Sequence, residues 1–155
     1  MLDRLDSGIT LARRRSTRLA LLFLDLDNFK DINDSRGHAV GDSVLRDTAA
    51  CLSKAVRTSD TVSRQGGDEF LLLLVEIAAA ADAAQVAAKI LAGLNDRAGL
   101  GDAADRVTAS VGIALYPDDA TDAMSLIAMA DGAMYRAKQA GGHRFAFHAE
   151  PVPSQ

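Results

Sequence analysis

The chain has 155 residues, of which 48% are hydrophobic and 25% charged, a balance typical of one globular domain with its own core. Its net charge of −4 and pI near 5.3 argue against a general nucleic-acid-binding protein, which is usually basic. The longest apolar runs, Leu19–Leu24 and Phe70–Val75, are far shorter than the roughly 18 residues that span a membrane.

The first half of the chain predicts a helix, a strand and a second helix. Leu and Ile at helical spacing indicate an amphipathic helix from Leu2 to about Arg18. Leu19–Leu24 predicts a buried strand that ends at Asp25-Leu26-Asp27. Apolar residues recur with a helical period between Gly41 and Arg57. The single Cys51 on that helix excludes an internal disulfide, and no secretory signal is visible, so we expect a cytoplasmic protein.

A hairpin opens the second half of the chain. Gly66-Gly67 separates two runs, Asp60–Arg64 and Phe70–Val75, and glycine supplies the positive φ of a tight two-residue turn. The elements predicted next are an alanine-rich helix over 78–98, a strand over Val107–Tyr116, a helix over Met124–Lys138 ended by Gly141-Gly142, and a short strand over Arg144–His148.

The predicted order of elements indicates an α+β fold. A strand-helix-strand-strand-helix-strand core is the ferredoxin-like, or split βαβ, plan. We therefore expect a central, mainly antiparallel sheet flanked by helices. The domain is predicted to span residues 1–149, and residues 150–155 form a C-terminal tail.

Four acidic residues are expected at one edge of this sheet. Asp25 and Asp27 follow the buried strand, and Asp68 and Glu69 lie at the hairpin. Each pair taken alone is more often a solvated loop than a metal site. A sheet can bring a strand end beside a hairpin, however, and clustered carboxylates repel unless a cation or burial compensates. Magnesium fits best, because it takes oxygen ligands and commonly bridges carboxylates to substrate phosphates.

Segment 28–42 is dense in polar side chains directly after the buried strand. Asn33 and Asp42 could read the edge of a purine, since amide and carboxylate groups suit guanine. Lys30 could meet a phosphate as a point charge. The structural alternatives are that Asn33 caps a turn, that Asp42 caps the following helix and that His38 is a turn residue.

Several motifs follow one another along the chain: Leu24-Asp25-Leu26-Asp27-Asn28-Phe29-Lys30, Ile32-Asn33-Asp34, Gly37-His38, Gly41-Asp42, Arg64-x-Gly66-Gly67-Asp68-Glu69-Phe70, Thr108-Ala109-Ser110-Val111-Gly112-Ile113-Ala114, and Ala130-Asp131 with Ala133-Met134-Tyr135-x-Ala137-Lys138. In kind, order and separation they resemble the motifs of the GGDEF-domain diguanylate cyclases. The match runs from about Leu19 to Phe147, which leaves chance little room. Nucleotidyl cyclase palm domains share the same ferredoxin-like plan.

The resemblance implies that two GTP molecules are condensed into cyclic di-GMP with release of two pyrophosphates. It assigns Mg²⁺, or Mn²⁺ in its place, to Asp25, the backbone carbonyl of Leu26, Glu69 and Asp68. The catalytic residues would be Glu69, Asp68 beside the 3′-hydroxyl, and Lys30 against phosphate charge. The substrate-binding residues would be Asn33 and Asp42 at guanine, with His38, Lys138, Gly66 and Gly67 as further contacts.

The product implied by the resemblance also predicts how many domains must act together. It is a symmetric ring made from two GTP molecules, whereas one domain binds one GTP molecule. Two domains must face each other, so we expect a homodimer for catalysis. The family further implies additional sensor or effector domains in a longer protein. We expect no nucleic-acid partner and no membrane segment in this chain.

Arg57-Thr58-Ser59-Asp60 stands just before the hairpin and matches the R-x-x-D inhibitory motif of the family, where product binds. Arg57 would grip phosphate or guanine, and Asp60 would accept from a guanine edge. The structural alternative for such a short pattern is a salt bridge at a helix end.

Two features depart from the family pattern. The D-x-L-T-x-L-x-N-R segment that normally precedes the first helix is not in the chain, and glycine stands at position 142 where an arginine often follows the phosphate-binding lysine; Arg136 or Arg144 could compensate. We therefore expect the activity of this chain to be weakened or absent. One alternative is a regulatory module that binds GTP or cyclic di-GMP and controls another domain. Another is a nucleotidyl cyclase that makes a mononucleotide.

Overall fold

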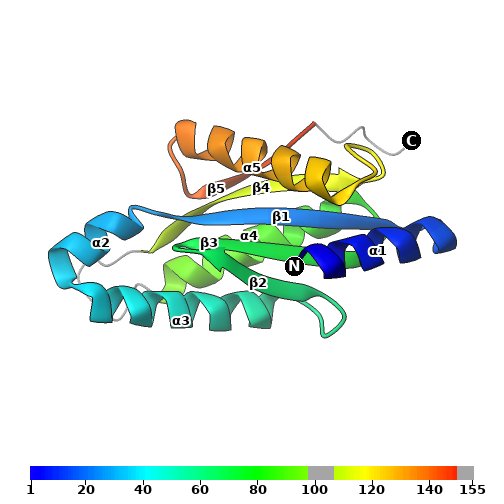
Figure 1. Ribbon diagram of the computed structural model, residues 1–155. Coiled ribbons are helices and arrows are strands. Elements are labelled where there is room, and N and C mark those ends of the chain that lie inside the picture. The colour runs from blue at the N-terminus through cyan, green and yellow to red at the C-terminus, as the bar shows by residue number, and fades with distance from the viewer. Residues whose placement is uncertain (98–106, 150–155) are drawn as a thin grey trace.

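The computed structural model describes residues 1–97 and 107–149, which build one sheet with helices on both faces (Figure 1). The predicted tail over residues 150–155 lies outside the described residues. Within the described ranges, no helix is both long enough and apolar enough to cross a membrane. The elements in chain order are α1 (Leu2–Arg15), β1 (Arg18–Asp27), α2 (Phe29–Arg36), α3 (His38–Ala55), β2 (Thr61–Gly66), β3 (Glu69–Ile77), α4 (Ala80–Arg97), β4 (Thr108–Tyr116), α5 (Ala123–Gln139) and β5 (Arg144–Phe147).

The five strands lie in the order β2-β3-β1-β4-β5. The central strand β1 is antiparallel to both β3 and β4, β2 is antiparallel to β3, and only β4 and β5 pair in parallel. The first four strands reproduce the ferredoxin-like plan, with β5 added at one edge. The predicted α+β fold with a mainly antiparallel sheet is confirmed.

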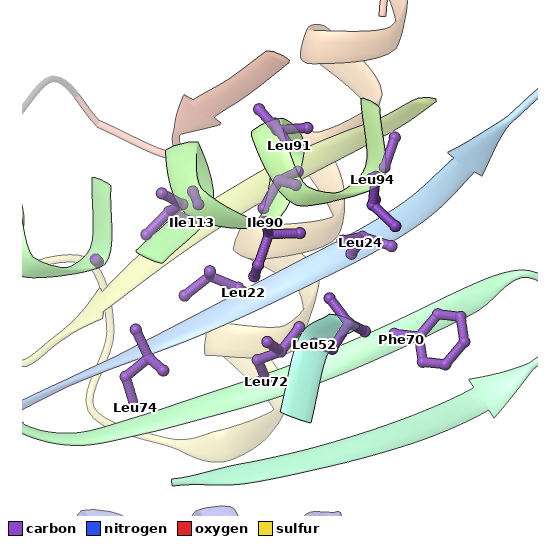
Figure 2. Close-up of a cluster of buried hydrophobic side chains, with 14 of the residues drawn as sticks. Leu22, Leu24, Leu52, Phe70, Leu72, Leu74, Ile90, Leu91, Leu94 and Ile113 are labelled. Carbon is purple, nitrogen blue, oxygen red and sulfur yellow. The ribbon is translucent and has the colours of Figure 1, made fainter. Parts of the chain in front are cut away.

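The core lies on both faces of the sheet, and β1 contributes to each. Leu22 and Leu24 of β1 pack with residues of α3 and α4, such as Leu52 and Ile90 (Figure 2). The alternate residues Leu19, Leu21 and Phe23 face α1 and α5 instead. Burial on both faces explains why β1 reads as an unbroken apolar run. Because strand side chains alternate, Asp25 and Asp27 belong to the face that α1 and α5 cover.

The structure corrects two details of the predicted elements. Helix α2, over Phe29–Arg36, was not predicted, because Phe29 is its one buried residue and so no apolar period marks it. The hairpin turn is Gly67-Asp68 rather than Gly66-Gly67, since Gly66 already pairs with Glu69. Gly67 has φ +51°, so the positive φ expected of the turn falls on this glycine.

Candidate active site

Acidic residues from neighbouring strands meet at one end of the sheet. Asp25 of β1 is the register partner of Glu69, the first residue of β3. A backbone hydrogen bond of 3.3 Å from Leu26 N–H to the carbonyl of Asp68 fastens the hairpin turn to β1. Asp25 is buried, while Asp68 and Glu69 are half-buried. The three carboxylates predicted at this edge are therefore together, and we call Asp25, Asp68 and Glu69 the acid cluster.

Lys138 of α5 brings a positive charge to the acid cluster. Its Nζ lies 2.6 Å from Oδ1 of Asp25. Burial lowers the pKa of Lys138, but the hydrogen bond and charge of Asp25, with the charges of Asp68 and Asp27, outweigh it and hold that pKa above its ordinary value. The ammonium group therefore stays charged beside the acid cluster.

Burial, with the neighbouring charges, raises the pKa of two carboxyl groups. Burial raises the pKa of Asp25, and the charges of Asp68 and Asp27 add to this against the opposing effect of Lys138. Burial raises the pKa of Glu69 as well, followed by the charges of Asp25, Asp131 and Asp68. Both directions are those expected of crowded carboxylates, and a cation placed among them would lower both pKa values.

The acid cluster offers the oxygen ligands that Mg²⁺ prefers. Oδ1 of Asp25 is buried and, apart from its ion pair with Lys138, accepts no hydrogen bond from the described residues. Over the same residues, no three His, Cys, Asp or Glu side chains are gathered as a ready metal site. A cation at Asp25 and Glu69 would thus need further oxygens, from the Leu26 carbonyl or from substrate phosphates, which is the usual way that Mg²⁺ is held.

Asp27 does not join the acid cluster as the sequence suggested. Its carboxylate accepts hydrogen bonds from the hydroxyls of Thr108 at 2.8 Å and Ser110 at 2.7 Å, and from the backbone N–H of His143 at 3.0 Å. These partners come from β4 and from the loop between α5 and β5. Asp27 therefore ties the loop that follows α5, the helix that carries Lys138, to the end of β1. No local signal in the sequence separates this role from that of Asp25.

The backbone conformation and the surroundings of position 142 explain why glycine stands there. Its φ is +71°, and a Cβ on it would lie 3.0–3.2 Å from the carboxylate of Asp27. The arginines considered as replacements for the family arginine are engaged with backbone oxygens. Arg136 donates to the carbonyls of Phe147 and His148 at 2.9 Å, and Arg144 donates to the carbonyl of Gly142 at 3.1 Å. Arg136 thus fastens the end of β5 to α5, and Arg144 bonds to the loop that precedes β5.

The residues predicted to read guanine lie on two successive helices. Asn33 is half-buried on α2 and Asp42 is exposed on α3, with Gly37, at φ +86°, between the helices. Gly37 is the N-cap residue of α3, and Asp42 lies inside that helix, so the alternative of Asp42 as a helix cap is excluded. Asn33 likewise lies inside α2 rather than at a turn.

The remaining predicted substrate contacts are at the solvent-facing side of the same region. Lys30 is exposed in the first turn of α2, and His38 is exposed as the first residue of α3. Asp42 lines an open groove of about 600 Å³ together with Leu45, Arg46 and Phe70. Apolar and polar side chains both line the groove, among them Val62, Ser53 and Arg64. Sequence patterns did not indicate this groove, because it forms only where α3 packs beside β2 and β3, and no local pattern marks that packing.

Arg57 and Asp60 are joined by a hydrogen bond from the backbone of Arg57 and not by its side chain. The carboxylate of Asp60 accepts from the N–H of Arg57 at 2.9 Å and from the N–H of Val75 at 3.1 Å. In place of the salt bridge considered as the alternative, the Asp60 carboxylate caps the turn and binds it to β3. The exposed Arg57 side chain borders a pocket of about 200 Å³, which Asp82 and Lys89 of α4 also line.

Known proteins that resemble this chain carry the same family assignment as its motifs. The family model described as "Diguanylate cyclase, GGDEF domain" matches residues 1–144. The chain is 43% identical over 145 residues, 94% of its length, to the bifunctional diguanylate cyclase/cyclic di-GMP phosphodiesterase MucR of Pseudomonas aeruginosa, and 44% identical over 143 residues, 91% of its length, to diguanylate cyclase TpbB of the same species. It spans only 21% of MucR and 33% of TpbB.

Solved structures agree with these sequence relatives. The crystal structure of the GGDEF domain of TpbB superposes with a TM-score of 0.87 at 37% identity, covering 97% of this chain and 93% of that one. The GGDEF domain of DgcB from Caulobacter crescentus, in complex with c-di-GMP, superposes with a TM-score of 0.83 at 29% identity, covering 94% of this chain and 86% of that one. The chain belongs to the GGDEF diguanylate cyclase family.

Proposed function

We propose that this domain is one half-site of a diguanylate cyclase, which condenses two GTP molecules into cyclic di-GMP and releases two pyrophosphates. The observation that carries the proposal is the acid cluster: Asp25 and Glu69 are fixed as partners on adjacent strands with Lys138 beside them. The named activities of MucR and TpbB, and the c-di-GMP bound to the DgcB domain, support the same chemistry.

Asp25, Glu69, Asp68 and the carbonyl of Leu26 would hold Mg²⁺, or Mn²⁺ in its place. The metal would neutralise phosphate charge when bound. Asp68, at the hairpin turn, would lie beside the 3′-hydroxyl of GTP and help to remove its proton. Lys138 would stabilise the phosphates from the side of α5, and Lys30 from the side of α2. Gly66 and Gly67, which carry no side chains, would let the triphosphate approach the hairpin.

Recognition of the base would fall to the α2–α3 region. The amide of Asn33 and the carboxylate of Asp42 together offer the donor and acceptor groups that match guanine, and His38 would be a further contact. In-line attack on phosphorus needs positioning and charge neutralisation more than covalent help. The division of labour between the acid cluster and the two helices meets both needs.

Assembly follows from the symmetry of the product. Because each domain would hold one GTP, two copies must face each other, and the rate should rise with the square of protein concentration while dimers are scarce. We also propose a cytoplasmic setting, additional domains in a longer protein, and cyclic di-GMP as an inhibitor at Arg57 and Asp60.

The direct test is to incubate the chain with GTP and Mg²⁺ and to identify the product by mass. Cyclic di-GMP and pyrophosphate are expected, with activity lost in Glu69→Gln. A mononucleotide product would indicate a different cyclase reaction. GTP binding without any product would support the regulatory alternative, and full activity of Glu69→Gln would remove Glu69 from the site.

A further inference from the structure

Gly41 of α3 is in close contact with the side chain of Asn33. A Cβ built on Gly41 would lie 1.9 Å from Oδ1 and 2.9 Å from Cγ of Asn33, and 3.3 Å from Cζ of Phe29. No side chain can occupy that point while the amide keeps its place. Gly41 is buried, so the Asn33 amide lies over the surface of α3 one residue before Asp42.

The backbone at Gly41 does not require glycine. Gly41 lies inside α3, and its φ is outside the positive region that disfavours other residues. Alanine is the better helix former at such a position, because glycine loses more backbone freedom on folding. Gly37, between α2 and α3, is the opposite case, since its φ is +86°. The local gain from glycine at position 41 is therefore the space used by Asn33.

We propose that Gly41 is a positioning residue for base recognition, which seats the Asn33 amide beside Asp42 so that both face one guanine. This inference rests on the proposed function, in which Asn33 and Asp42 read the base. Oδ1 is the free end of a rotatable side chain, and the Phe29 ring at 3.3 Å need give by only a few tenths of an ångström. A methyl group at position 41 would therefore turn the amide aside rather than break the helix. The expected effect is on guanine recognition and not on folding.

A matched control exists on α5. Gly132 is also inside a helix and outside the positive-φ region, but a Cβ on it would meet no atom within 4 Å. Gly132→Ala and Gly41→Ala therefore make the same change in helix propensity. They differ in whether the new methyl group meets the Asn33 amide.

The test measures binding of a non-reactive GTP analogue, guanosine 5′-(α,β-methylene)triphosphate, and of its adenosine counterpart by calorimetry with Mg²⁺. Gly41→Ala should weaken guanosine binding about tenfold, the effect of losing one or two good hydrogen bonds, and leave adenosine binding unchanged. Asn33→Ala should show a similar loss, and the double variant should lose little more. Gly132→Ala should bind as the wild type does, and both glycine variants should melt at or above the wild-type temperature.

The outcomes separate the inference from the function on which it rests. Wild-type guanosine binding by Gly41→Ala, beside weakened binding by Asn33→Ala, would overturn the role of Gly41. A lowered melting temperature of Gly41→Ala, or an equal loss for both nucleotides, would overturn it as well. If Asn33→Ala binds guanosine normally, or the wild type shows no preference for guanosine, the proposed base site itself is wrong.

Discussion

The acid cluster and the α2–α3 region both carry predicted substrate contacts, but the fold fixes them in different ways. Asp25 and Glu69 are register partners between buried strands, so the sheet itself sets their separation. Asn33, Asp42 and Lys30 stand half-buried or exposed on two helices beside a glycine link. The reacting end of the nucleotide would thus meet a rigid, desolvated surface, while the base would meet side chains that can be changed without unfolding the domain.

The comparison predicts the largest loss of activity at the acid cluster. Asp25→Asn keeps the size of the side chain and removes its charge, so cyclic di-GMP formation should fall about 1000-fold, as when one strong electrostatic contact to a transition state is removed. The measurement is the initial rate with GTP and Mg²⁺.

The same variant should fold at least as well as the wild type. Burial raises the pKa of Asp25 above its ordinary value of 3.8, so the folded state holds this proton longer than the unfolded state. Stability then falls as pH rises from 3.8 through the raised pKa, and the ionised group destabilises the fold at neutral pH. A melting temperature of Asp25→Asn well below that of the wild type at pH 7 would contradict this account.

Gly112 of β4 tests how closely α5, the helix that carries Lys138, packs against the sheet. A Cβ there would lie 1.9 Å from the carbonyl oxygen of Ala130 and 2.2 Å from the N of Met134, both backbone atoms of α5. Because backbone cannot rotate aside, Gly112→Ala should lower the free energy of unfolding by about 3 kcal/mol, at the upper end of the usual overpacking cost. Urea denaturation measures this, with Gly132→Ala as the control.

Positions 41 and 112 differ in what a new methyl group would contact. At position 41 the added methyl group meets the end of a side chain, and at position 112 it meets the backbone of a packed helix. Equal destabilisation by the two Gly→Ala changes would mean that the α2–α3 region is as tightly constrained as the sheet.

Asp27 should affect activity by holding Lys138 in position and not by taking part in the reaction. Asp27→Ala removes the acceptor of three hydrogen bonds and should lower the free energy of unfolding by about 1–3 kcal/mol. With the end of α5 released, Lys138 should lose its place, and kcat should fall by about tenfold to 100-fold, the range seen when a residue that orients a ligand is lost. Asp27→Asn should be more stable than Asp27→Ala, because the amide oxygen still accepts hydrogen bonds. Asp25→Asn, in contrast, should remain inactive although it keeps the size of the side chain.

The sequence predicted the fold and the meeting of the acids because both depend on strong patterns. The two-sided apolar run of β1 and the glycine turn fix the register that pairs Asp25 with Glu69. Helix α2 was missed because its polar residues show no apolar period. The separate fates of Asp25 and Asp27 could not be predicted, because two acids on one face of a strand differ only in what β4 and the α5–β5 loop place against them.

The smallest effect on the initial rate is expected at the turn of Arg57 and Asp60, which lies away from the acid cluster. Arg57→Ala keeps the backbone N–H that donates to Asp60, so the turn should persist and the initial rate should stay within about twofold of the wild type, as for most surface substitutions. Its exposed guanidinium is the group available to hold phosphate or guanine of the product.

Progress curves at rising cyclic di-GMP measure this prediction. The wild type should slow as product accumulates, and Arg57→Ala should continue until GTP is spent. Asp60→Asn serves as the contrasting variant, because Asp60 also caps the turn through the N–H of Val75 and should lose stability together with inhibition. An unchanged plateau in Arg57→Ala would show that the pocket beside α4 is not the product site.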